Sequence, residues 1–180
     1  MKIGKLLLLL MLLSVSVVAQ QKNEPKPDKW QPLRFLVGSW EGTAAGQSGN
    51  GKVEREYRFA LNGAFIEVKN KSTYPAQEKN PKGEVHEDQG FISYDKLRKK
   101  FVMRQFHVEG FVNQYTLTSI SDDGKTLVFE TESIENIPAG WRGRETYKLT
   151  GNDQFTEVFE LAAPGKEFSV YSESTLKRKK

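Results

Sequence analysis

Residues 100–120 read KFVMRQFHVEGFVNQYTLTSI, and this stretch decides the fold. Two segments rich in aromatic and β-branched side chains, 100–108 and 111–120, flank the dipeptide Glu109-Gly110. Such side chains favour strands, and a glycine between two of these segments favours a hairpin turn. The stretch therefore predicts two neighbouring antiparallel strands.

The same rhythm continues in both directions along the chain. Glycine, proline, asparagine and aspartate gather in short gaps between these segments. Every proline after Pro32 lies in such a gap, as a sheet requires, because proline lacks the backbone donor that a strand ladder needs. We expect strands at 35–44, 52–61, 64–73, 85–94, 100–108, 111–120, 126–134, 142–149, 153–161 and 167–176.

Short connections between consecutive strands favour an up-and-down sheet, which keeps two unprotected edges unless it closes on itself. Closure pairs the first strand with the last and removes both edges. The predicted fold class is therefore all-β, an antiparallel up-and-down β-barrel of about ten strands. Residues 32–36 (PLRFL) are expected to form one short helical turn that plugs one end.

The N-terminus has the pattern of an export signal. Two lysines precede an unbroken apolar run, and the small residues up to Ala19 suit a cleavage site. We expect a signal peptide at 1–19, a flexible leader at 20–31 and the barrel domain at 32–180. Because the apolar run is short for a bilayer span, we expect a periplasmic or secreted protein without stable membrane insertion after cleavage. An uncleaved N-terminal anchor is the alternative.

Composition limits the partners of this domain. The 180-residue chain contains no cysteine, so an exported domain must rely on its core rather than on disulfides. The formal charge of +4 arises at the termini, since without the two N-terminal lysines and Lys177–Lys180 the chain has 21 basic and 23 acidic residues. Nucleic-acid binding needs a basic face, so we expect no nucleic-acid partner. The basic C-terminal residues are expected to be solvated.

Residues 35–42 read FLVGSWEG, a G-x-W motif at the start of the predicted strands. It resembles the opening strand of lipocalins and, most closely, of nitrobindin-like haem-binding barrels and their uncharacterised exported bacterial relatives. The similarity continues through Arg55-Glu56-Tyr57 and Leu61-Asn62-Gly63, and the strand rhythm matches over about residues 32–178. The resemblance implies a barrel in which Trp40 packs across the floor, against the last strands, and it makes haem a candidate cofactor.

One feature departs from that family. Nitrobindin-like proteins ligate haem iron through a histidine near the last strands, whereas the two histidines of this chain are His86 and His107. Tyr171 is the nearest candidate ligand in the final segment, since tyrosine can bind ferric haem. A packed or surface tyrosine is the other interpretation.

The candidate ligand site centres on the hairpin at 100–120. Large apolar side chains mix there with a few polar ones, which is the composition of a ligand pocket. We expect the face that carries Met103, Gln105 and His107 to point inward and Arg104 to point outward. The candidate ligand-binding residues are Trp40, Met103, Gln105, His107, Tyr115, Trp141 and Tyr171.

Two other groups of residues have competing interpretations. Trp141, in the loop at 135–141, belongs either to the rim of an entrance or to a capping apolar cluster. Carboxylates of the later strands, including Glu145 and Glu157, are expected mainly in ion pairs on the outer surface, with a minority inside. His86-Glu87-Asp88 is compatible with a metal site, but we expect solvated charges there.

The sequence contains no nucleophile elbow, P-loop or H-E-x-x-H motif, which favours a binding protein over an enzyme. The leading hypothesis is an exported barrel that holds a small hydrophobic or amphipathic molecule. A haem-binding nitrobindin-like barrel with redox or peroxynitrite chemistry is the first alternative. A structural or partner-binding barrel with a filled interior is the second.

Overall fold

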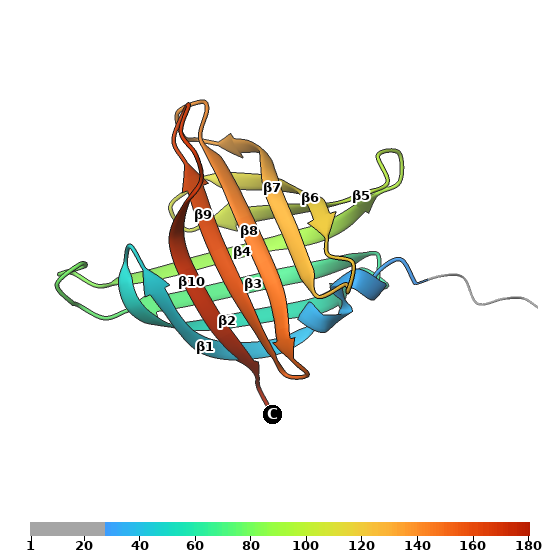
Figure 1. Ribbon diagram of the computed structural model, residues 1–180, viewed down its shortest axis with the longest axis horizontal. Coiled ribbons are helices and arrows are strands. Elements are labelled where there is room, and N and C mark those ends of the chain that lie inside the picture. The colour runs from blue at the N-terminus through green and yellow to red at the C-terminus, as the bar shows by residue number, and fades with distance from the viewer. Residues whose placement is uncertain (1–27) are drawn as a thin grey trace, which may run out of the picture.

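The computed structural model describes residues 28–180, which form a closed antiparallel barrel (Figure 1). Its strands are β1 (Gly38–Gly46), β2 (Gly49–Ala60), β3 (Phe65–Tyr74), β4 (Glu84–Asp95), β5 (Lys100–His107), β6 (Val112–Ile120), β7 (Thr126–Glu135), β8 (Arg142–Gly151), β9 (Gln154–Ala162) and β10 (Ser169–Arg178). Each strand pairs with the next one along the chain, and β10 pairs with β1 to close the sheet. The predicted class, strand number and up-and-down order are confirmed.

A short 3₁₀ helix, η1 (Gln31–Leu36), precedes β1 and plugs one end of the barrel. Pro32 lies in the first turn of this helix, where a backbone N–H has no partner within the helix, so proline loses no hydrogen bond there. Leu33 and Leu36 are fully buried in the core. The predicted helical turn is confirmed, but the first strand begins at Gly38 rather than at residue 35, because η1 extends to Leu36.

Trp40 lies where η1 meets the sheet, and it has no exposed surface. Its indole N–H donates to the carbonyl oxygen of Leu36 at 2.7 Å, and its ring meets Phe155 of β9 edge-on, with 4.7 Å between centroids. The guanidinium of Arg178, from β10, lies 4.1 Å from the centre of the same ring. The predicted position of Trp40, across one end of the barrel and against the last strands, is confirmed.

The packed domain begins before Pro32. Trp30, which the predicted leader included, is only 5% exposed, and its ring packs at 5.3 Å from Phe101. Its indole N–H donates to the carbonyl oxygen of Gly63 at 3.0 Å. The predicted signal peptide and residues 20–27 of the predicted leader lie outside the described residues. Among residues 28–180, no helix is long and apolar enough to cross a membrane.

The inward-facing side chains change character along the barrel. Near η1 they are apolar and fully buried, as at Met103 of β5 and Phe155 of β9. Two residues farther along the same strands, the inward positions hold Gln105 and Glu157. Because buried Met103 and Gln105 alternate with exposed Arg104, the predicted inward face of this strand is confirmed.

The prediction of a solvated C-terminus holds for Lys177, Lys179 and Lys180, which are exposed, but not for Arg178, which is partly buried. Strand β10 continues to Arg178, and this side chain donates to the carbonyl oxygen of Val37 at 2.8 Å. Lys179 donates to Glu54 on β2 at 2.6 Å. The guanidinium satisfies a backbone carbonyl just past the end of η1, where helix geometry leaves such groups unpaired. The basic terminus therefore helps to close the barrel over its plug.

Candidate ligand cavity

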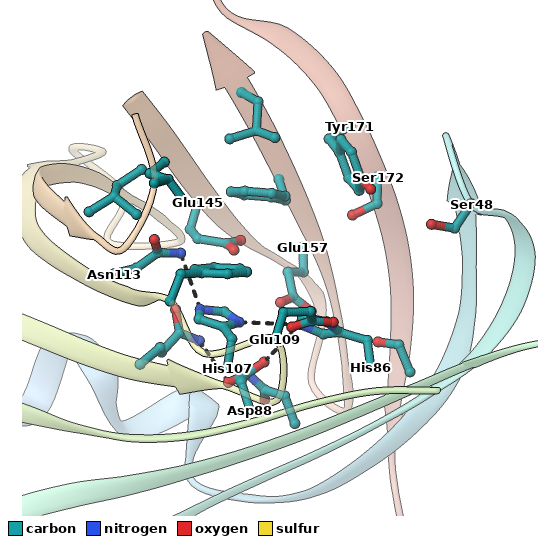
Figure 2. Close-up of a pocket in the computed structure, with 18 of the residues that line it drawn as sticks. Ser48, His86, Asp88, His107, Glu109, Asn113, Glu145, Glu157, Tyr171 and Ser172 are labelled. Carbon is teal, nitrogen blue, oxygen red and sulfur yellow. Dashed lines mark hydrogen bonds and ion pairs between the residues drawn. The ribbon is translucent and has the colours of Figure 1, made fainter. Parts of the chain in front are cut away.

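The end of the barrel opposite η1 contains a cavity of about 590 Å³. Odd-numbered strands end there and even-numbered strands begin there, so residues from many strands reach it. Figure 2 shows side chains from facing walls, including His107 and Glu157, directed into this space. The volume lies within the usual range for small-molecule sites, about 300–1,000 Å³.

An apolar belt surrounds the upper part of the cavity. It combines strand residues with residues of the connections at this end, and its members are Phe111, Ile134, Ile137, Trp141, Phe159 and Tyr171. Phe159 and Tyr171 meet edge-on, with ring centroids 5.8 Å apart. Trp141 keeps 37% of its surface exposed, as a side chain at an entrance does. We name this set the belt.

Below the belt the lining is polar. Arg55 of β2 and Glu157 of β9 form an ion pair across the barrel, with 2.9 Å between Nε and Oε2, and both side chains are only 8% exposed. Arg55 also donates to the carbonyl oxygen of Lys71 at 3.2 Å and to the Ser72 hydroxyl at 3.3 Å. A charge withdrawn from water needs such partners, because its desolvation costs several kcal/mol. We name this region of the lining the floor.

Glu145 of β8 adds a second carboxyl group to the floor. Burial raises its pKa well above the ordinary value, and the negative charge of Glu157 raises the pKa further. The positive charge of Arg55 acts in the opposite direction but is weaker than either effect. Glu145 is therefore held toward its protonated, neutral form.

The floor also contains acceptors that are not in use. Within residues 28–180, seven buried side-chain oxygens lack a hydrogen-bond partner, and four of these belong to the floor: Asn70 Oδ1, Gln105 Oε1, Asn113 Oδ1 and Glu145 Oε2. All four residues line the cavity. A buried polar atom without a partner costs about 1–3 kcal/mol, so a molecule that brings donors to the floor would recover this energy.

Acidic groups outnumber basic ones in the cavity. Of the described residues that line it, one carries a guanidinium, Arg55, and five carry carboxyl groups. The five are Glu84, Asp88, Glu109, Glu145 and Glu157. Burial raises the pKa of Asp88 to about 6, although the nearby charge of Arg55 lowers it. The lining therefore disfavours an anion and favours a cation or a neutral donor.

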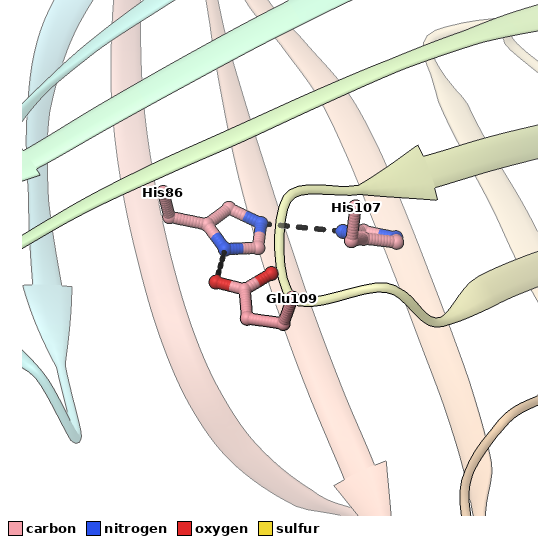
Figure 3. A group of neighbouring side chains, drawn as sticks. All are labelled: His86, His107 and Glu109. Atoms are coloured by element: carbon pink, nitrogen blue, oxygen red, sulfur yellow. Dashed lines mark hydrogen bonds and ion pairs between the residues drawn. The ribbon is translucent and has the colours of Figure 1, made fainter.

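A histidine pair connects the floor to the entrance (Figure 3). His107 Nδ1 lies 3.2 Å from His86 Nε2, and His86 Nδ1 lies 2.7 Å from the Glu109 carboxylate. The Asn113 amide contacts His107 Nε2 at 3.2 Å, and Phe111 stacks on the ring at 4.1 Å. Burial, and to a lesser degree the charge of His86, lower the pKa of His107 to about 4. His107 is consequently a neutral imidazole at physiological pH.

The structure brings five of the seven candidate residues to the cavity. The five are Gln105, His107, Tyr115, Trp141 and Tyr171. Trp40 and Met103 instead lie in the packed half, fully buried against the core. Trp40 contacts the plug and Phe155, so it closes the plugged end of the barrel and is not part of the cavity wall.

Sequence reasoning expected a minority of the later carboxylates inside but did not identify which ones, and it did not place Arg55 in the lining. Glu145 and Glu157 are inside the barrel, whereas the surface ion pairs expected on these strands are represented by Arg144 and Glu160, which form two hydrogen bonds at 2.6 and 2.8 Å. The alternation of side chains contained the missing signal. Arg55 and Glu145 each lie two residues from a buried tyrosine of the same strand, which places them on the inward face.

The chain is similar to one protein family and to several solved structures. A family model described as "THAP4-like, heme-binding beta-barrel domain" matches residues 29–178. The crystal structure of Rv2717c from M. tuberculosis is similar with a TM-score of 0.62 and 18% identity, over 86% of this chain and 99% of that one. A de novo designed fluorescence-activating β-barrel has a TM-score of 0.41 and 12% identity, over 81% of this chain and 95% of that one. No curated protein matches the chain. Because the family model spans nearly all of the described barrel, the chain belongs to the family of THAP4-like, heme-binding β-barrel domains.

Proposed function

We propose that this protein binds a small amphipathic molecule, with its apolar part against the belt and its hydrogen-bond donors on the floor. The observation that carries the proposal is the division of one cavity of about 590 Å³ into an apolar upper part and a floor with four unused acceptors. A barrel with a filled interior would not contain such a space. Apolar walls with a few convergent polar groups are typical of small-molecule sites.

The charge of the lining narrows the ligand class. Five carboxyl groups and one guanidinium line the cavity, and Arg55 is already paired with Glu157. An ammonium or another donor-rich group suits the unused oxygens of the floor, whereas a carboxylate would meet like charges. The preferred ligand is therefore an amphipathic cation or a neutral molecule rich in donors, with an aromatic or aliphatic body for the belt.

Haem is the second candidate, because the family is described as haem-binding. His107 and Tyr171 both face the cavity and belong to types that ligate haem iron. The lining nevertheless fits haem poorly. The acidic residues of the cavity oppose the two propionates of haem. We derive no haem chemistry from this site.

Export is the third part of the proposal, and it rests on the N-terminal sequence. A signal peptide at 1–19 would deliver the barrel to a periplasmic or extracellular space, where the cavity meets molecules that the cell takes up or releases. The intact mass of the protein isolated from each cell fraction tests this. Full-length chain confined to the cytosol would contradict it.

Native mass spectrometry of the protein purified from its own compartment tests the binding function. We expect a co-purifying small molecule at one per chain, which leaves when the cavity is altered by Glu145→Arg and stays in the outward-facing control Glu160→Gln. Titration with haemin separates the second candidate. A Soret band that appears at one equivalent and is lost in Tyr171→Phe or His107→Ala would replace our ligand with haem.

A further inference from the structure

The wall of the cavity contains a cluster that the ligand site does not use. His86 on β4 and His107 at the end of β5 lie on adjacent strands, and the register pairs His107 with Asp88, two residues beyond His86. Both histidines therefore project from the same face of the sheet. Glu109, in the turn after β5, brings a carboxylate beside them (Figure 3).

We propose that His86, His107 and Glu109 bind one divalent transition-metal ion at the edge of the cavity. Each of the three offers a ligand atom, and these atoms all lie within 4.8 Å of one another. Two imidazoles and a carboxylate are the donor set that suits zinc or iron(II) and leaves further coordination positions open. The open positions of such an ion face the cavity, because all three residues line it.

The spacing of the two imidazoles already matches a shared ion. His86 Nε2 and His107 Nδ1 lie 3.2 Å apart. Two nitrogens that bind a tetrahedral zinc ion at about 2.0–2.1 Å lie roughly 3.3–3.4 Å from each other. Replacement of the proton between the rings by an ion therefore requires almost no movement of the strands. Glu109, which contacts Nδ1 of His86 at 2.7 Å, reaches an ion on Nε2 by rotation of its half-exposed side chain in the turn.

Neighbouring side chains orient these donors as outer partners do in metal sites. The Asn113 amide contacts Nε2 of His107, and the stacked ring of Phe111 fixes the imidazole plane, so Nδ1 is left directed at His86. Partners of this kind set the tautomer and orientation of metal-binding histidines.

Asp88 offers a further oxygen. Its Oδ1 accepts hydrogen bonds from Asn70 at 2.8 Å and from Gln105 at 3.2 Å. Its other oxygen, Oδ2, lies 3.8 Å from His86 Nε2. The two amides thus hold the carboxylate so that one oxygen remains free on the side of the histidine pair, where it can complete the coordination or hold a metal-bound water.

The electrostatics of the wall also favour a cation at this position. Asp88 and Glu109 flank His86 on its two sides, and the one guanidinium among the described lining residues is paired with Glu157. A divalent ion would balance these two carboxylates. This site goes beyond the proposed ligand binding, since its three ligand residues belong neither to the belt nor to the residues with unused acceptors.

Isothermal titration of the full chain with Zn²⁺ tests the proposal, with protein that carries no histidine tag and has been treated with a chelator. We expect one Zn²⁺ per chain, and the absorption bands of four- or five-coordinate Co²⁺ when cobalt replaces zinc. Loss of an outer partner costs about 10–100-fold in metal affinity, so removal of a ligand in His86→Ala is expected to cost at least about 100-fold. Glu109→Gln is expected to weaken binding by at least about 10-fold.

Glu87→Gln is the matched control. Glu87 lies between His86 and Asp88 on β4 but is exposed on the outer face, where it pairs with Lys71 at 2.8 Å. Its substitution is expected to leave zinc affinity unchanged. Thermal unfolding without metal verifies that each variant folds, and Glu109→Gln keeps the test valid if His86→Ala does not, because Glu109 is half-exposed in a turn. No binding by the wild type, or equal binding by Glu109→Gln and Glu87→Gln, would overturn the proposal.

Discussion

The two halves of this barrel are built by the same strands, yet one is a dry core and the other a charged cavity. On β2, fully buried Tyr57 lies in the packed half and Arg55 lies in the floor, two residues away. On β9, Phe155 and Glu157 show the same change. Two residues advance a strand by about 7 Å, so the boundary between the halves is sharp.

This difference separates stability from binding. The packed half contains the plug, Trp40 and most of the large buried rings, whereas the hollow half contains paired charges and unused acceptors. Buried apolar surface stabilises the fold, while an unsatisfied polar group destabilises it. We infer that the packed half maintains the barrel and that the hollow half is kept open for a ligand at some cost in stability.

A pair of tryptophan substitutions tests this comparison most strongly. Trp40→Ala removes a fully buried ring from the packed half and is expected to cost about 3–5 kcal/mol in the free energy of unfolding. Trp141→Ala removes a partly exposed ring from the entrance and is expected to cost less than about 1 kcal/mol. Urea unfolding measures both, and similar losses in the two variants would contradict the division.

Substitutions in the buried ion pair of Arg55 and Glu157 test whether the charges of the floor are withdrawn from water. Arg55→Met leaves Glu157 buried beside Glu145 without its partner, and breaking such a pair typically costs about 3–5 kcal/mol. The double variant Arg55→Met/Glu157→Met removes both charges and is expected to recover most of that loss. Chemical denaturation of the two variants decides the matter. A single variant as stable as the wild type would show that the floor is solvated.

Truncation of the C-terminus tests whether its last residues stabilise the packed half. A chain that ends at Leu176 loses the hydrogen bond from Arg178 to Val37 and its contact with the Trp40 ring. Hydrogen bonds from charged groups contribute about 1.5–3 kcal/mol, so we expect a loss of about 2 kcal/mol. Deletion of Lys180 alone serves as the control in thermal unfolding. Equal melting temperatures of the two truncated proteins would mean that the terminus does not support the plug.

The raised pKa of Glu145 in the hollow half predicts a smaller effect, a dependence of the free energy of unfolding on pH. Its pKa in the folded state is raised above the value of about 4.3 expected in the unfolded chain. Between these two values the unfolded state has released a proton that the folded state keeps, so the stability of the wild type falls as pH rises through this window. Glu145→Gln lacks this decline and should gain stability over the wild type with rising pH. Urea midpoints measured from about pH 4.5 to pH 8 give the difference, which would be constant if Glu145 ionised normally.

Much of the fold could be predicted because turn residues and strand residues alternate so regularly. Gly110 and the prolines in the gaps depend on local backbone rules, which one sequence reveals, whereas the position of Trp40 followed from the resemblance to a known family. The inward face of β5 followed from the alternation of Met103 and Gln105 with Arg104. The confirmed plug followed from the apolar residues around Pro32.

The charged floor could not be predicted in the same way. The alternation of side chains places Glu157 on the inward face with Phe155, but it does not show that Arg55 is the partner of Glu157 across the barrel. The contact joins residues 102 positions apart, so no local pattern contains it. The role of Arg178 was missed for the same reason, since it depends on a contact with Val37, far away in the chain.

Binding of two fluorescent probes that share one aromatic body tests the central claim most directly. One probe carries an ammonium group and the other a carboxylate. The account predicts saturable binding of the cationic probe at one site per chain, at least about 10-fold tighter than the anionic probe, which corresponds to about 1.4 kcal/mol. Trp141→Ala is expected to weaken it, because this substitution removes a ring of the belt. Tighter binding of the anionic probe, or no binding of either one, would contradict the account.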